Sequence, residues 1–124
     1  MLRAIILVGA GGGIGSIFRY LTSVFVGKYF HAVFPLATFI ANILGCLIIG
    51  LLFGLFERHN LTNPDLKYLF VTGFCGGYTT FSTFAAENIN LFQSENSLTA
   101  FAYIAASVIV GLLAVWIGLA ITRM

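Results

Sequence analysis

Four long apolar runs, separated by short polar segments, make up almost the whole chain. Each run has the roughly 20 residues that a helix needs to cross the hydrocarbon core of a bilayer. We therefore predict membrane-spanning helices at about residues 4–29, 33–57, 66–92 and 96–122. The expected fold is an all-α integral membrane protein, with one four-helix domain over residues 1–124 and no separate soluble domain.

Polar positions interrupt the third run in an unusual way. A glycine pair, Gly76 and Gly77, is followed by hydroxyl side chains interleaved with two phenylalanines, in the order Thr79, Thr80, Phe81, Ser82, Thr83 and Phe84. We expect the helix to break at the glycine pair, because glycine reaches conformations closed to other residues. Within hydrocarbon such a break is tolerated only against other protein or beside water. Carbonyls freed there can bind a cation and the hydroxyls can donate to an anion, so the pattern indicates ion handling.

Other polar and small positions fall on defined helix faces. Thr38, Asn42 and Cys46 recur at four-residue steps and so share one face of the second helix. Small residues four apart allow close contact between membrane helices, and examples in this chain are Gly9/Gly13, Gly11/Gly15 and Gly50/Gly54.

Composition agrees with a membrane protein and excludes several classes. Of the 124 residues 60% are hydrophobic and only 8% are charged, against about a quarter in soluble domains. The net charge is +2 and the basic residues are scattered, so no nucleic-acid partner is expected. No nucleophile–base pair, metal cluster or acid pair occurs at a workable spacing, so we do not expect an enzyme.

Basic residues near the helix ends bear on orientation. Four of them, Arg3, Arg58, Lys67 and Arg123, fall on one side of the predicted bundle, and Lys28 falls on the other. The positive-inside rule then favours cytoplasmic termini. The expected location is the cell (inner) membrane, crossed several times.

Three motifs, in order, carry a family resemblance: Gly-Gly-Ile-Gly-Ser-Ile-Phe-Arg-Tyr at 12–20, Phe-Pro-Leu-Ala-Thr-Phe-Ile-Ala-Asn at 34–42 and Gly-Gly-Tyr-Thr-Thr-Phe-Ser-Thr-Phe at 76–84. In a four-helix chain of this length they resemble the CrcB/Fluc family of fluoride channels. The resemblance implies a passive channel that exports cytoplasmic fluoride and so lowers its toxicity. It also implies an antiparallel, dual-topology homodimer with two fluoride pathways.

The resemblance further implies a structural sodium ion at the dimer centre. Its ligands in this chain would be the backbone carbonyls of Gly76 and Thr79 from both subunits, and the pore phenylalanines would be Phe81 and Phe84. Oxygen ligands without carboxylates suit such an ion better than zinc or a transition metal.

Residue chemistry can be weighed beside that resemblance. Moving an isolated ion into low dielectric costs tens of kcal/mol, so donors must replace the water around fluoride. Candidate donors are the hydroxyls and one amide of Asn42, Thr80, Ser82, Thr83, Tyr103 and Ser107. An aromatic ring also presents a positive edge to an anion. For Asn42, Tyr103 and Ser107 the alternative is hydrogen bonding between helices, which is common in membrane bundles.

Two ionisable residues lie nearest the interiors of the spans and are functional candidates. Arg19 either draws anions into a vestibule or extends its side chain to the interface. Glu87 lies one turn beyond Thr83, where it either bonds a pore hydroxyl or marks the end of the helix.

Two other functions compete with a channel. Small dual-topology exporters of the multidrug type are also short four-helix proteins, but they need a titratable carboxylate in the first helix, and this chain has none there. A non-conducting assembly subunit would explain the glycine pairs but not a hydroxyl-rich helix break.

Overall fold

The computed structural model describes residues 1–123, and within that range every regular element is helical. The predicted all-α class is thus confirmed. The helical elements, in chain order, are α1 (Leu2–Tyr29), α2 (Leu36–Arg58), α3 (Pro64–Leu66), η1 (Lys67–Cys75), α4 (Gly76–Tyr78), α5 (Phe81–Gln93) and α6 (Ser97–Arg123).

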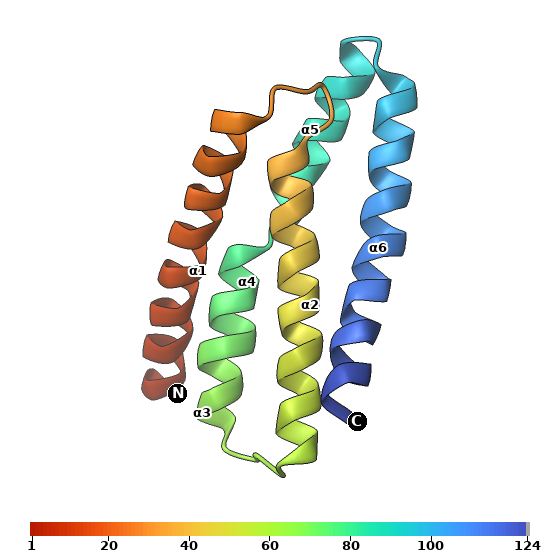
Figure 1. Ribbon diagram of the computed structural model, residues 1–124. Coiled ribbons are helices and arrows are strands. Elements are labelled where there is room, and N and C mark those ends of the chain that lie inside the picture. Colours follow the sequence, from red (N-terminus) through yellow and green to blue (C-terminus); the bar gives the residue numbers. More distant parts are fainter. Residues whose placement is uncertain (124) are drawn as a thin grey trace.

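The long elements stand side by side in a bundle (Figure 1). The segment formed by α3, η1 and α4 packs between α1 and α2, and α6 packs along the other side of α2. Both termini lie at the same end, as an even number of crossings requires. Beyond the break, α5 continues toward the opposite end and contacts α6.

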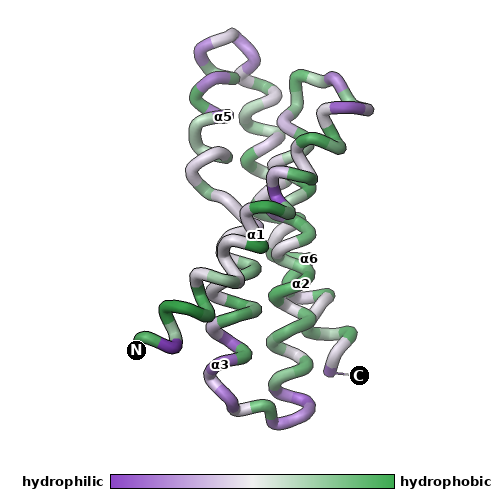
Figure 2. Tube along the Cα trace, turned by 90° about the vertical axis from the view of Figure 1, so that its left-hand side faces the viewer, coloured by the Kyte–Doolittle hydropathy of each residue, from purple (hydrophilic) through white to green (hydrophobic). Residues whose placement is uncertain are grey.

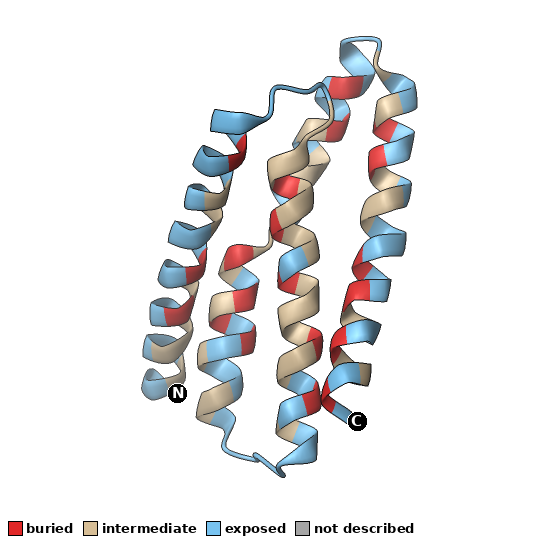
Figure 3. Ribbon diagram, viewed as in Figure 1, coloured by how far each residue is buried: buried red, intermediate tan, exposed pale blue. Residues whose placement is uncertain are grey.

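Three of these helices, α1, α2 and α6, are long and apolar enough to cross a membrane. Figure 2 shows hydrophilic residues gathered at the two ends of the bundle and hydrophobic residues through its middle. Buried positions lie where helices face one another, whereas the outer faces are exposed and apolar (Figure 3). That distribution is typical of a protein whose outer surface meets lipid.

The third crossing departs from the expected continuous helix in two ways. Its first part, η1, is a π-helix, a form with i→i+5 hydrogen bonds that is rare and often marks functional sites. Its break lies at Thr79 and Thr80, which are both extended, and not at the glycine pair. Gly76 is itself in the right-handed helical region, with φ −62° and ψ −36°.

Close helix contact explains why glycine occupies position 77. A Cβ there would collide with the carbonyl of Gly12 on α1. The expected Gly11/Gly15 contact is confirmed too, because a Cβ at either position would collide with the backbone of the third crossing. A Cβ added at Gly9 or Gly13, in contrast, would meet nothing within 4 Å, so this pair makes no such contact within the chain.

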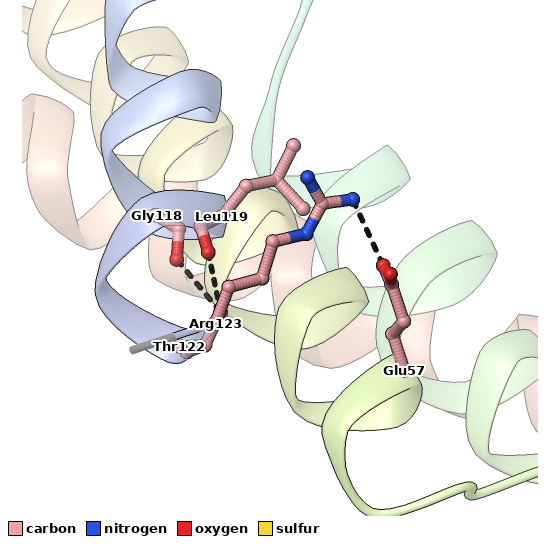
Figure 4. Close-up of polar contacts among 5 residues, drawn as sticks. All are labelled: Glu57, Gly118, Leu119, Thr122 and Arg123. Carbon is pink, nitrogen blue, oxygen red and sulfur yellow. Dashed lines mark hydrogen bonds and ion pairs between the residues drawn. The ribbon is translucent and has the colours of Figure 1, made fainter.

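Contacts between α2 and α6 continue to the end that carries the termini. Gly50 lies against the backbone of Val115, and Gly54 leaves room for the side chain of Thr122. The Thr122 hydroxyl donates to the carbonyls of Gly118 at 2.9 Å and Leu119 at 3.2 Å (Figure 4).

Ion pairs at the same end place the basic residues where the charge pattern predicted them. Arg123 pairs with Glu57 at 2.9 Å (Figure 4), and Arg3 pairs with Asp65 at 2.7 Å. Both arginines are exposed, so each pair contributes at most about 1 kcal/mol to stability.

Candidate functional site

The break in the third crossing is held by a side chain of α2. The amide oxygen Oδ1 of Asn42 accepts from the backbone N–H of Thr80 at 2.7 Å, and its Nδ2 donates to the Thr80 carbonyl at 3.1 Å. The Thr80 side chain in turn caps α5, since its Oγ1 accepts from the N–H of Thr83 at 3.3 Å. The extended backbone at position 80 thus has a partner for each polar group.

These contacts leave carbonyl oxygens free on the α4 side of the break. In an α-helix the N–H of Thr80 would donate to the carbonyl of Gly76, but here it is diverted to Asn42. The Thr79 carbonyl receives only a 3.5 Å contact from Nη1 of Arg19. The Thr79 carbonyl is therefore weakly engaged, and the Gly76 carbonyl lacks its helical donor. These are the two oxygens expected to hold sodium, and both fit a cation.

An open groove includes Gly76 and Thr79 in its lining. Its volume is about 330 Å³, and it is mostly apolar; its lining includes Asn42, Gly45, Cys46, Cys75, Gly76, Thr79 and Phe81. The two cysteines share this groove. Within residues 1–123 no group of three or more His, Cys, Asp or Glu side chains is placed to hold a metal ion.

The two candidate pore phenylalanines lie together on α5. Their ring centroids are 5.7 Å apart, and Phe81 is 78% exposed. With Asn42, Ser107 and Val108 they line a small hollow of about 180 Å³. The hydroxyl of Ser107 is buried, and it has no hydrogen-bond partner among the described residues.

Glu87 and Tyr103 are joined directly. The Tyr103 hydroxyl donates to Oε1 of Glu87 at 2.8 Å, and the hydroxyl of Thr38 donates to Oε2 at 2.9 Å. Tyr103 is completely buried, with the rings of Phe34 and Phe84 packed against it at 5.2 Å and 4.9 Å between centroids. Glu87 therefore bonds a candidate pore hydroxyl, and it does not mark the helix end, since α5 continues to Gln93.

Arg19 lies over a second, more polar hollow. This hollow has a volume of about 250 Å³ and is lined by Ser16, Arg19, Tyr20, Ser23, Ala37, Thr38, Thr80 and Thr83. The guanidinium is half-buried and contacts the break, so it faces the bundle. Of the two interpretations of Arg19, this position favours the vestibule.

The structure brings most of the expected residues together, and Ser82 is the one with the weakest polar contact. The Ser82 hydroxyl is exposed and lies 3.4 Å from Oγ1 of Thr80, with no closer polar partner among the described residues.

Three residues of the site were not among the expected site residues. Thr38 bonds Glu87, Ser16 lines the polar hollow, and the buried Tyr78 bonds Thr22 through its hydroxyl at 2.8 Å. The four-residue spacing of Thr38 and Asn42 was a signal for Thr38, and all three residues fall within the motifs at 12–20, 34–42 and 76–84.

Known proteins are similar to this chain over nearly its whole length. Residues 6–119 match the family described as CrcB-like protein, Camphor Resistance (CrcB). A protein of Flavobacterium psychrophilum named fluoride-specific ion channel FluC is 52% identical over 122 residues, which cover 98% of both chains. Proteins with the same name are 45% identical in Azobacteroides pseudotrichonymphae, over 99% of this chain and 98% of the relative, and 40% identical in Stutzerimonas stutzeri, over the full length of both.

Proposed function

Because the chain belongs to the CrcB family, whose relatives are fluoride-specific ion channels, we propose a route for fluoride through its bundle. The protein is a multi-pass membrane protein and a fluoride channel. Its role is to let cytoplasmic fluoride leave down its gradient and so to limit fluoride toxicity.

The unpartnered hydroxyl of Ser107 carries the proposal. A buried hydroxyl without a partner is unfavourable, and this one lines the hollow shared with Phe81 and Phe84. A fluoride ion in that hollow accepts the Ser107 proton in a hydrogen bond and meets the positive edges of the two rings.

Further donors near this hollow extend the route. The hydroxyls of Thr80, Ser82 and Thr83 lie at the start of α5, on the side of the polar hollow that holds Arg19. The positive guanidinium raises the local anion concentration there. Tyr103, one turn before Ser107 on α6, lies beside the route, and its hydroxyl is bonded to Glu87, which also accepts from Thr38 of the polar hollow. Asn42 lines the hollow as well and is the remaining candidate in the route.

We further propose a structural sodium ion at the break. The support is that the Gly76 carbonyl lacks its helical donor and that Thr79 presents a second carbonyl beside the same groove. Sodium would supply positive charge to a path in which Arg19 is the nearest cationic side chain.

We also propose that the working unit is an antiparallel homodimer. The groove at the break is open on one side and flanked by the exposed ring of Phe81, so a second copy seated there would cover the carbonyls and complete each route. Two copies of opposite orientation would also bring two sets of break carbonyls to one central cation.

The function proposed is a channel, and not an enzyme or a proton-coupled exporter. α1 carries no acidic residue that could exchange protons, and its charged side chains are Arg3, Arg19 and Lys28. The hydroxyl-rich break with an unpartnered donor also distinguishes the chain from a subunit that only packs.

Fluoride efflux from liposomes tests the route. Purified wild-type protein should release fluoride rapidly, as read by a fluoride electrode, with chloride retained under the same gradient. Phe81→Ile and Ser107→Ala should each reduce the flux by about tenfold or more, because each removes a group that replaces fluoride hydration. Phe25→Ile, another exposed phenylalanine outside the hollow, is the matched control. Unchanged flux in both pore variants would refute the route, and no wild-type flux would refute the channel.

A further inference from the structure

The two hydrogen bonds between Asn42 and the main chain of Thr80 stand out in the bundle, because one side chain of α2 satisfies both the N–H and the C=O of a single residue in the third crossing. Asn42 lies in the N-terminal third of α2, and Thr80 lies in the extended link between α4 and α5. The distances are 2.7 Å for the N–H of Thr80 and 3.1 Å for its carbonyl. Both ends of the amide are thereby engaged.

We infer that Asn42 is a positioning residue that keeps the third crossing broken and thereby frees the Gly76 carbonyl for a cation. The inference rests on the proposed function, of which it explains one part. It differs from a role of Asn42 as a fluoride ligand, since the amide protons that would serve an anion include the one donated to Thr80.

The alternative state of the backbone shows why a side chain is needed. With no acceptor at position 42, the Thr80 N–H would be left without a partner in an apolar bundle, which is unfavourable unless it bonds the Gly76 carbonyl instead. That bond is the ordinary i→i−4 bond of an α-helix. Closing it would continue α4 through Thr80 and engage the carbonyl of Gly76, a residue that lines the groove.

Among the described residues, Asn42 is the acceptor that the N–H of Thr80 has. Arg19 contacts the preceding carbonyl, that of Thr79, at 3.5 Å, and the Thr79 hydroxyl donates back to the Cys75 carbonyl at 2.8 Å. Both contacts stabilise Thr79, but neither holds the N–H of Thr80. Cys46, one turn along the same face of α2, lines the same groove and forms no hydrogen bond through its side chain within residues 1–123.

The test compares sodium-dependent thermal stability of purified wild type with two variants at position 42. A bound cation raises the melting temperature as its concentration rises. Asn42→Ala should need about tenfold more sodium for the same rise in melting temperature. The reason is that the Thr80 N–H then bonds the Gly76 carbonyl, which is no longer free to bind the cation. Asn42→Asp keeps an oxygen for the Thr80 N–H, so its sodium dependence should match or exceed that of the wild type. Cys46→Ala is the matched control and should behave as the wild type.

Each outcome supports or refutes the role of Asn42. The inference is overturned if Asn42→Ala keeps the wild-type sodium dependence, or if the wild type shows none when sodium replaces a large organic cation. Should the alanine variant fail to fold, Asn42→Asp decides alone, because loss of its sodium dependence also refutes the role of the acceptor oxygen. Fluoride flux is measured separately. Absence of wild-type flux together with the expected sodium pattern would refute the channel and leave the role of Asn42 standing.

Discussion

The hydroxyl of Tyr103 on α6 donates to the carboxylate of Glu87 on α5 at 2.8 Å, and it does so from a completely buried ring. The same carboxylate accepts from Thr38 on α2. One acidic side chain therefore connects three helices next to the proposed fluoride route. An acid this close to an anion path is acceptable because two hydroxyls donate to it, which spreads its charge.

Tyr103→Phe should lower both stability and fluoride flux. The variant keeps the ring and its aromatic contacts but removes one donor to a charged group, which is worth between about 0.6 and 3 kcal/mol. Thermal melting in detergent and liposome efflux measure the two effects. Tyr29→Phe is the control, since that ring is 61% exposed and outside both hollows, and its hydroxyl forms no hydrogen bond within residues 1–123. Equal melting temperatures for Tyr103→Phe and wild type would contradict the importance of this contact.

Gly77→Ala should destabilise the protein by about 1–3 kcal/mol, as overpacking commonly does. The new methyl group would meet the Gly12 carbonyl and push α1 away from the third crossing. Gly13→Ala, whose methyl group meets nothing within 4 Å, should leave stability unchanged or raise it slightly. Thermal melting compares the two variants. Similar melting temperatures for Gly77→Ala and Gly13→Ala would contradict the close approach of α1 to the third crossing at Gly77.

Arg19→Gln should reduce fluoride flux several-fold at low ionic strength, with a smaller reduction in high salt. The reason is that an arginine beside an open hollow attracts anions over a Debye length, which shortens from about 10 Å at 0.1 M salt to about 3 Å at 1 M. Efflux measured at both salt concentrations separates this effect from a folding defect. Lys28→Gln is the control, because Lys28 is exposed at the far end of α1. A flux loss independent of salt would assign Arg19 a structural role through Thr79.

An antiparallel dimer predicts that a single loop is found on both sides of the membrane. Cys46 and Cys75 are replaced by alanine, and Thr62→Cys then places one thiol in the exposed loop between α2 and α3. An impermeant thiol reagent should modify about half of the molecules from outside and the rest only after permeabilisation. Modification from one side alone would instead follow the bias of Arg3, Arg58, Lys67 and Arg123 toward one end.

Much of the candidate site could be found from local pattern. Phe81 and Phe84 are three residues apart in the sequence, a spacing that brings side chains together on one helix, and their rings do lie together. The shared face of Thr38, Asn42 and Cys46 predicted a polar stripe on the second helix. Neither pattern said what the stripe would contact. Thr38 faces Glu87 and Asn42 faces Thr80, and both partners lie outside α2, 49 and 38 positions away in the chain.

The sequence alone determined that this is a four-crossing membrane protein with an interrupted third helix, because length and apolarity of a run decide whether it can enter a bilayer. It also placed both termini at one end. Only the tertiary structure decided where the interruption falls. Glycine permits a break but does not require one, and Gly77 is occupied with the close approach of α1. The break lies at Thr79 and Thr80 because Asn42, on another helix, provides the hydrogen bonds that an α-helix would have provided within itself.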